Sequence, residues 1–540
     1  MDGLNSIIVF NNIKLPIDAS HKEAFSVAAK RLKATSSNCP TSELRVYRRS
    51  IDARHKDDIK FVYSISAPYF GKMPPEAMLR KYDCSVISET KPEITIGETP
   101  LSAPPVIIGA GPAGLFAALL LSELGYEPVL VERGGSIAER TAAVKRFYRT
   151  HILDLNSNIQ FGAGGAGTFS DGKLVTRIND PLTAYVLDKF VEFGGPSDIR
   201  YIAKPHLGTD ILSGIVEKIT ERIEENGGRV LYNTRMLYPK HSLGRVTSVV
   251  TDKGEIPCGA LILAIGHSAR DTQERLVDEG FSVEAKSFSV GMRIEHPASL
   301  IDESMYGSYA GHPALGHAEY NLAYDTKVRG VYTFCMCPGG EVVAAASEEG
   351  GVVVNGMSYH SRSGKNSNSA VVCSVFKEDY GNTPKAAIDF QRKIEQKAFI
   401  AGGGNFRAPI ITVGDFLSGK CSREPSVVSP TYMNGDNVTL RSPEEYLPSV
   451  VTDSIKRALV DFDRKISGFA SDFAVFTGAE TRTSSPIRIT RDRETCLAIG
   501  FDNLFPSGEG AGYAGGITSA AIDGLRCAMA LMKIFKPRQI

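Results

Sequence analysis

The segment VIIGAGPAGLFAALLLSELGYEPVLVER, Val106 to Arg133, constrains the fold of this chain more than any other. Gly109, Gly111 and Gly114 have GxGxxG spacing, follow an apolar strand and open a long apolar helix. Glu132 ends the second strand, as the acidic residue of a dinucleotide-binding βαβ unit does. The glycines would provide a tight turn, close approach of a pyrophosphate and close helix–strand packing, and the helix N-terminus would attract phosphate. We expect Glu132 to accept hydrogen bonds from ribose hydroxyls.

This pattern leaves NAD and FAD open as ligands, so further glycine-rich segments become informative. FAD is longer, and its flavin end reaches beyond the first sheet. Three segments have the required composition: FGAGGAGTFSDGK (161–173), LILAIGHSAR (261–270) and PSGEGAGYAGGITSAAIDG (506–524). A dense run of glycines allows the backbone to approach a ligand closely. We therefore predict FAD as the cofactor, held at both ends by distant parts of the chain.

The late segment, 506–524, carries the most detailed expectation. We expect Glu509 to bond the ribitol or pyrophosphate region, with Gly508 leaving room for it. A helix is predicted to begin near Ile517 and to carry Asp523. The backbone of Gly515, Gly516 and Ile517 would then point N–H groups at flavin N1 and the C2 carbonyl, where a helix N-terminus stabilises the negative charge of reduced flavin. The alternative for the first turn is a βαβ unit with a structural glycine turn and no nucleotide. The alternative for the late segment is a tight helix–helix seam of small residues.

The remaining pattern predicts an α/β protein in which a Rossmann-like FAD-binding domain carries an inserted mixed α+β substrate domain. Residues 1–98 form a small α+β (βαββ) domain with a helix opened by Ser20 and Glu23. Residues 99–280 and 471–540 form the FAD domain, and 281–470 the insertion. Within the FAD domain we expect a helix after Ser136 and Glu139 to about residue 150, and another over 210–225. Strands at 229–233, 245–252 and 255–259 form a meander before the apolar strand ALILAIG.

Composition narrows the functional classes. The 540 residues have no net charge, so no global field favours nucleic acid. The nine cysteines are scattered and form no CxxC, which argues against a metal site of the zinc-ribbon kind and against a dithiol flavoenzyme of the thioredoxin reductase kind. The start lacks a basic signal-peptide region and the most apolar run is too short to span a bilayer. We expect a cytoplasmic protein that does not contact a membrane.

Several motifs resemble known flavoproteins. VIIGAGPAG with Glu132–Arg133, the meander before LAIG and GEGAGYAGGI resemble the FAD domain of the glutathione-reductase-like superfamily. FGAGGAGTFSDGKL, FCMCPGGEVV, NGMSYHSR, GAETRTSSPIR and PSGEGAGYAGGI resemble a bacterial family labelled FAD-dependent or NAD(FAD)-utilising dehydrogenases, over most of the chain. The resemblance implies FAD and the fold more firmly than a substrate.

By that resemblance a set of residues lines FAD. The set is Gly109, Gly111, Ala113, Gly114, Glu132 and Arg133 for the ADP half, and Gly164, Gly165, Thr168, Lys173, Gly266, Gly508, Glu509, Gly515, Gly516 and Ile517 for the rest. No second strand–GxGxxG–helix occurs, since AGGGNF at 401–406 lacks a preceding strand. NAD(P)H is therefore expected to dock only transiently, if it is a reductant.

The predicted reaction is hydride transfer between an unidentified small molecule and flavin N5, in a cleft between the FAD domain and the insertion. Candidate catalytic residues are Lys173, beside Asp171, and Arg482, a possible clamp for carboxylate or phosphate. Each is equally well interpreted as an ordinary loop charge. His267 and His296 are alternative acids or bases.

Other features have plainer interpretations. Cys335 and Cys337 are interpreted as small core residues on one face of a strand. Two rival functions remain: an RNA-modifying flavoprotein using the basic hairpin RRSIDARHK, and a non-catalytic FAD-binding protein. The hairpin also carries acidic residues, so nucleic acid is an unlikely partner.

Overall fold

The computed structural model describes residues 6–35, 41–69, 74–88, 93–176, 180–325 and 329–538. The chain forms two compact units. Unit 1 holds the residues up to 93 together with 177–206 and 299–318, and unit 2 holds the rest.

Unit 1 contains an antiparallel sheet in the order β2-β3-β1-β4. Its elements are β1 (Ser6–Pro16), α1 (His21–Thr35), β2 (Arg45–Asp52), β3 (Lys60–Tyr69), α2 (Glu76–Lys81) and β4 (Cys84–Ser88). Ala24, Ala28 and Leu32, spaced four residues apart on α1, are buried. The predicted βαββ unit is confirmed, and β4 adds a strand that the pattern did not reveal. Unit 1 also contains α5 (Leu182–Glu192) and most of α8 (Ala298–Tyr306).

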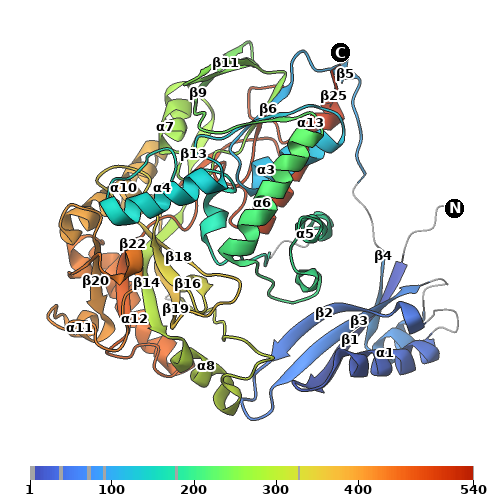
Figure 1. Cartoon of the computed structure of the whole chain (residues 1–540), viewed down its shortest axis with the longest axis vertical. Coiled ribbons are helices and arrows are strands. Elements are labelled where there is room, and N and C mark those ends of the chain that lie inside the picture. Colours follow the sequence, from blue (N-terminus) through green and yellow to red (C-terminus); the bar gives the residue numbers. More distant parts are fainter. Residues whose placement is uncertain are drawn as a thin grey trace. The chain divides into compact units, whose positions relative to one another are not determined.

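The centre of unit 2 is a five-stranded parallel sheet in the order β24-β12-β6-β7-β8 (Figure 1). The strands are β6 (Pro105–Ile108), β7 (Val129–Val131), β8 (Arg229–Leu231), β12 (Ala260–Leu263) and β24 (Leu504–Pro506), and the associated helices are α3 (Pro112–Glu123), α4 (Ile137–Thr150) and α6 (Gly208–Glu225). β6, β7, β12 and β24 are fully buried, as expected of a parallel sheet covered on both faces. The predicted α/β fold is confirmed.

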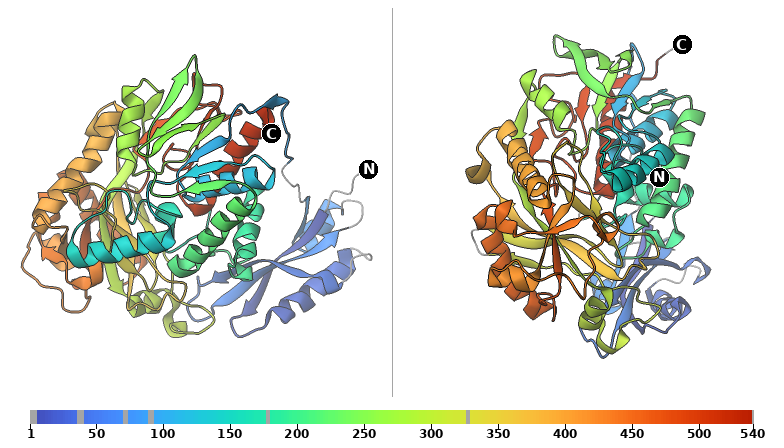
Figure 2. Two further views of the ribbon diagram at one scale, coloured as in Figure 1. Left: turned by 45° about the horizontal axis from the view of Figure 1, so that its top comes forward. Right: turned by 60° about the vertical axis from the view of Figure 1, so that its left-hand side comes forward.

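The late glycine-rich segment returns to this sheet. β24 pairs with β12, which pairs with β6. α13 (Ile517–Ile534) packs closely on α3, because the missing Cβ of Gly524 would lie 2.0 Å from the carbonyl oxygen of Ala113. Figure 2 shows α13, in red, beside the blue strands and helix of the first βαβ unit. β25 (Phe535–Lys536) then pairs with β5 (Thr99–Pro100).

The predicted meander exists, but its first strand was wrong. It consists of β9 (Met236–Ser242), β10 (Arg245–Thr251) and β11 (Gly254–Pro257), in the order β11-β10-β9. The residues at 229–231 instead form β8 of the parallel sheet. β9 contains Pro239 and a polar end, which resembles a loop in sequence, whereas β8 follows α6 and completes a crossover connection parallel to β7.

A seven-stranded mixed sheet forms the other part of unit 2, in the order β15-β16-β19-β14-β22-β20-β21. The strands are β14 (Phe288–Pro297), β15 (Ala323–Asp325), β16 (Gly330–Cys337), β19 (Asn366–Val375), β20 (Ala408–Thr412), β21 (Val438–Leu440) and β22 (Val475–Glu480). Two small sheets pair β17 (Glu341–Ala344) with β18 (Val354–Met357) and β13 (Val283–Ala285) with β23 (Ile487–Ile489).

The helices of this region are α7 (Arg270–Asp278), α9 (Lys377–Tyr380), α10 (Pro384–Gly402), α11 (Val413–Ser418) and α12 (Ser449–Lys465). The predicted helix after Pro384 is confirmed. AGGGNF lies at the C-terminal end of α10, where Gly403 caps the helix with a φ of 107°, so this glycine run ends a helix and does not follow a strand. β22 belongs to the seven-stranded sheet although it lies beyond residue 470, where the insertion was predicted to end. The predicted domain boundaries stay a prediction. No described helix combines the length and apolar character that crossing a membrane requires.

Candidate functional site

The first glycine turn has two structural glycines and one that faces open space. Gly109 has a φ of 100°, and its missing Cβ would lie 2.3 Å from the carbonyl oxygen of Ala264. The missing Cβ of Gly114 would lie 1.9 Å from the Gly109 oxygen. At Gly111 the nearest atom is 3.9 Å away, in Gly165. Gly109 and Gly114 therefore allow the turn and the helix packing, whereas Gly111 leaves room at the N-terminus of α3.

Glu132 connects this turn to the second glycine-rich segment. Its buried carboxylate accepts hydrogen bonds from the backbone N–H groups of Ala110 (2.8 Å), Gly134 (2.9 Å) and Gly162 (2.9 Å). A carboxylate has about four acceptor positions, so one remains for a hydroxyl. The neighbouring Arg133 forms an ion pair with Asp271 and stacks 4.3 Å over the ring of Phe161.

The second segment is folded around a residue that sequence reasoning missed, Arg140. Its guanidinium is fully buried and donates to the carbonyl oxygens of Asn158, Ile159, Ala163 and Gly165 at 2.7–2.8 Å. Burial lowers the pKa of Arg140 to about 9. A lone arginine in a helix gives no signal of this role, which needs the loop to fold back over α4.

The turn at 164–168 lies against the N-termini of two helices. The Gly164 N–H donates to the Ala110 carbonyl at 2.8 Å, and Thr168 Oγ1 donates to the Ala163 oxygen. The missing Cβ of Gly167 would lie 3.1 Å from Ile517 and 3.8 Å from Pro112, the first residues of α13 and α3. Two positive helix ends therefore meet beside one glycine-rich turn.

The late segment is held in place by Asp523. Its carboxylate accepts from the Gly508 N–H at 2.7 Å and forms a two-bond ion pair with Arg491. Gly508 has a φ of 75° and its missing Cβ would lie 2.9 Å from the Cβ of Ala113. Gly515 and Gly516 face open space, with no atom within 4 Å of the first and only Ser519 Oγ, at 3.9 Å, near the second.

Gly266 and Glu509 lie on adjacent turns. No atom lies within 4 Å of the missing Cβ of Gly266, which has a φ of 74°, while the missing Cβ of Gly510 would lie 2.3 Å from the Gly266 carbonyl oxygen. Glu509 is partly accessible. Burial raises the pKa of Glu509 to about 7. The nearby Lys286 opposes this increase and Cys335 adds to it. This carboxyl can therefore hold or release a proton near neutral pH.

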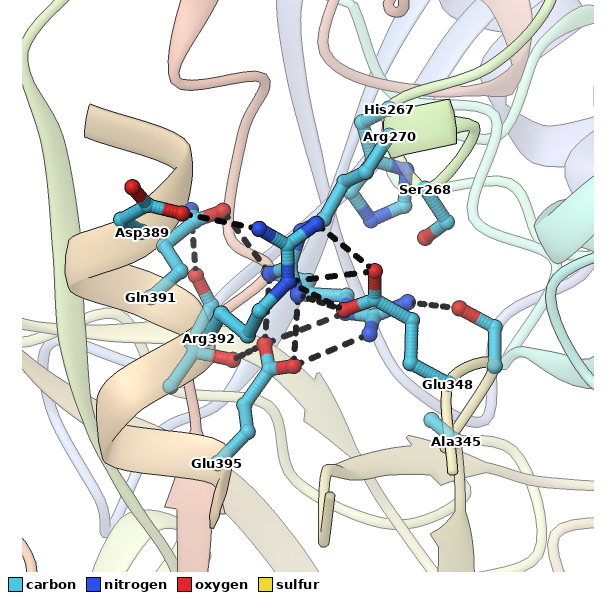
Figure 3. A network of polar contacts seen from close by, with 12 residues as sticks. His267, Ser268, Arg270, Ala345, Glu348, Asp389, Gln391, Arg392 and Glu395 are labelled. Carbon is cyan, nitrogen blue, oxygen red and sulfur yellow. Dashed lines mark hydrogen bonds and ion pairs between the residues drawn. The ribbon is translucent and has the colours of Figure 1, made fainter. Parts of the chain in front are cut away.

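Arg482 is buried and lies in a network of charged and polar side chains. Its guanidinium donates to Glu395 and Ser347, and Arg270 donates to the same Glu395 at 2.7 Å. Figure 3 shows Glu395 on α10 facing Arg270. The clamp role stays a prediction, since the donors of Arg482 have partners within the protein.

The two candidate histidines are also buried. Burial, with Arg482 and Arg270 nearby, lowers the pKa of His267 to about 3, so its ring is neutral at pH 7. His296, on β14, bonds the Phe469 oxygen through Nε2 at 2.7 Å, and burial lowers its pKa to about 4. Both rings are therefore buried and uncharged at pH 7, as expected of histidines that serve the packing of the fold.

Lys173 lies in a compact charged cluster of unit 2. Asp171, fully buried, accepts from Arg362 at 3.0 Å and also from Ser358. Lys173 Nζ lies 3.5 Å from Asp171 and 3.8 Å from Glu319, and its side chain is 25% exposed. Burial opposes the charge of Lys173, but the two carboxylates outweigh it and raise the pKa. Lys173 is therefore an accessible cation at the end of the glycine-rich loop.

The cluster continues to the CxC segment. Lys173 Nζ donates to the carbonyl oxygen of Met336, between the two cysteines. Arg293 is fully buried, forms a two-bond ion pair with Glu480 at 2.7 Å, and donates to the Cys335 carbonyl at 3.0 Å. Cys337 is fully buried and Cys335 partly exposed. The cysteines therefore border charged groups, which the interpretation as plain core residues did not anticipate.

Comparison with known proteins gives the family. A model described as "FAD binding domain" matches residues 103–151, one described as "FAD-dependent protein, C-terminal domain-like" matches 287–483, and a domain of unknown function matches 8–67. A Clostridium beijerinckii protein with the name "Uncharacterized protein" is 44% identical over 536 residues, or 98% of this chain and 99% of that protein. The chain belongs to this family of FAD-dependent proteins. Its cofactor is FAD.

Solved structures similar to this FAD-dependent protein have low sequence identity. L-amino acid deaminase from Proteus vulgaris is 15% identical, with 83% of this chain and 97% of that chain covered and a TM-score of 0.33. Glycine oxidase from Bacillus cereus is 9% identical, with 81% and 99% covered and a TM-score of 0.35.

The residues present fit FAD. Three glycine-rich turns converge, and along them the missing Cβ atoms of Gly266 and Gly515 would meet no atom within 4 Å, and those of Gly111 and Gly516 only one atom each, at 3.9 Å. Two helix N-termini supply N–H donors for anionic groups. Sequence reasoning found these turns because glycine requirements are local, but it missed Arg140, Arg362, Arg293 and Glu480, whose partners are distant in the chain.

Proposed function

We propose that this protein is an FAD-dependent oxidoreductase that transfers hydride between a small molecule and the flavin. The observation that carries the proposal is the position of Lys173. Its loop contacts the first glycine turn at Gly165 and ends in a charged cluster in which Lys173 stays accessible. A site for a polar substrate therefore adjoins the segments that hold the cofactor.

FAD, when bound, supplies a two-electron acceptor or donor at N5. The side chains supply charge and a proton. Lys173 stays protonated because of Asp171 and Glu319, and can orient an anionic or carbonyl group of the substrate. Glu509, with a pKa near 7 caused by burial, can accept or return the proton that accompanies hydride transfer.

We further propose that the protein is of the glutathione-reductase-like type without a dedicated NAD domain. The glycine run at 401–406 caps a helix and does not follow a strand, which argues against a second nucleotide-binding domain at this place. This supports transient docking of NAD(P)H as the alternative.

The test is anaerobic reduction of the FAD-loaded protein by NADH, NADPH and a panel of metabolites, followed by flavin absorbance. With the donor that bleaches the wild type, we expect Lys173→Met to reduce the rate about 10²-fold while FAD stays bound. Lys218→Met, an exposed lysine on α6, is the matched control. If Glu509 carries the proton, the rate of flavin reduction should change with pH near the pKa of Glu509, about 7. Glu509→Gln should remove this pH dependence. Equal rates in Lys173→Met and Lys218→Met would refute the role of the cluster.

The RNA alternative has weak support in unit 1. The basic hairpin is neutralised locally, because Asp52 pairs with Lys14 (3.2 Å) and Arg54 (2.7 Å), and Lys60 pairs with Asp58 (2.8 Å). Binding of tRNA that weakens steeply with salt would favour this alternative. Tight FAD binding with no reduction by any donor would favour a non-catalytic role.

A further inference from the structure

The CxC segment has the geometry of a reactive pair of thiols. Cys335 has a φ of 43°, in the left-handed region, and β16 shifts register between Phe334 and Cys337. In this local bend the Cys337 thiol donates a hydrogen bond to the Cys335 carbonyl oxygen at 3.3 Å, which holds Cys337 Sγ against the backbone of Cys335. Residues two apart lie within about 7 Å along any chain, which is within reach of a disulfide.

The charged cluster surrounds this pair and favours ionisation of one thiol. Arg293 donates to the Cys335 carbonyl at 3.0 Å and lies 4.0 Å from Cys337 Sγ. The neighbouring Cys337 thiol, together with Arg293 and Lys173, lowers the pKa of Cys335. Glu509 and Glu480 are the acidic groups that oppose this effect. A thiolate is the nucleophilic form of cysteine, and Cys335 is the accessible member of the pair.

The pair is also tied directly to the FAD-binding segments. Lys173, at the end of the loop that touches Gly111, donates to the carbonyl of Met336, between the two cysteines. Cys335 also contributes, after burial, to the raised pKa of Glu509, in the late glycine-rich segment. A plain core role for the cysteines requires none of these contacts.

We propose that Cys335 and Cys337 form a reversible dithiol–disulfide couple that exchanges two electrons with FAD. Oxidation breaks both S–H bonds and forms one S–S bond, and the two electrons and two protons pass to oxidised FAD. In the reverse direction the S–S bond breaks and both thiols regain protons. The inference rests on the proposed function because it gives the flavin an internal electron partner, and makes disulfides or thiols the substrate class.

The first experiment measures the thiols and not turnover. The FAD-loaded protein is equilibrated anaerobically in buffers of reduced and oxidised dithiothreitol, alkylated, digested and mapped by mass spectrometry. We expect the peptide with both cysteines to lose two hydrogens as the buffer becomes oxidising and to regain them on reduction. Cys373, buried on β19, should remain a free thiol in every buffer and should therefore be alkylated after denaturation each time. Two free thiols at 335 and 337 in all buffers would overturn the proposal.

The second experiment tests the link to FAD. The oxidised protein is photoreduced under anaerobic conditions with EDTA as the electron donor, and new thiols are counted after denaturation. We expect two new thiols per flavin in the wild type and none in Cys335→Ser or Cys337→Ser, with circular dichroism checking that both variants fold. Flavin reduction without new thiols in the wild type would overturn the electron exchange. A working couple in a protein that no donor reduces would instead refute only the proposed turnover.

Discussion

Replacing Gly524 by alanine tests the contact that joins the late segment to the first glycine turn. In this substitution a methyl group enters the seam between α13 and α3. The new Cβ would lie 2.0 Å from the carbonyl oxygen and 2.7 Å from the carbonyl carbon of Ala113. Both are backbone atoms, which cannot rotate away as a side chain can.

The magnitude follows from this distance. Ordinary contact begins at 3.4 Å, so the helices must separate by about 1.4 Å. Overpacking of this kind costs about 1–3 kcal/mol or more, against a gain in helix propensity of about 1 kcal/mol. Gly214→Ala is a matched control, because Gly214 lies in α6 with no atom within 4 Å of its missing Cβ. That control should gain about 0.5–1 kcal/mol. Because both variants gain helix propensity, they should differ by the overpacking cost, about 1–3 kcal/mol.

The chain has no tryptophan, so unfolding is followed by far-ultraviolet circular dichroism in urea. FAD affinity is measured by the recovery of free flavin fluorescence on dilution. Because the separation displaces the N-termini of two helices beside Gly167, Gly524→Ala should lower both the unfolding midpoint and the affinity for FAD. If Gly524→Ala matches Gly214→Ala in both measurements, the contact between the two helices does not organise the cofactor site.

Two further predictions concern buried ionisable groups. Burial lowers the pKa of His296 from 6.5 to about 4, so the folded state loses stability as pH falls through this range, by about 3 kcal/mol at pH 4. His296→Gln should flatten this part of the profile of urea midpoint against pH. The same substitution at the exposed His55 should leave the profile unchanged. Glu395→Gln leaves the two arginines bound to it without their shared buried counter-ion and should cost about 3–5 kcal/mol in urea unfolding, whereas the exposed Glu424→Gln should have little effect. A pH profile unchanged by His296→Gln, or equal midpoints for the two glutamate variants, would contradict the corresponding argument.

Local requirements made much of the fold predictable. A tight turn at Gly109 and close packing at Gly114 each need a residue without a side chain, and a short window of sequence records that need. The same holds for the capping box at Ser136 and Glu139, which the structure contains, and for the helix that begins at Ile517. The strand at 236–242 escaped prediction because its proline and polar residues carry no clear alternation.

The sequence by itself indicated FAD as the cofactor and predicted that the late segment joins the first βαβ unit, as the pairing of β24, β12 and β6 confirms. Only the tertiary structure decided which charges meet. Arg482 pairs with the buried Glu395, and Lys173 donates to a backbone carbonyl of the CxC segment. Arg140 donates to carbonyl oxygens of the loop that follows its helix. The physical reason is that a glycine's backbone demand is satisfied within a few residues. The partner of a buried charge depends instead on where distant segments are placed by the packing of the sheets and helices between them.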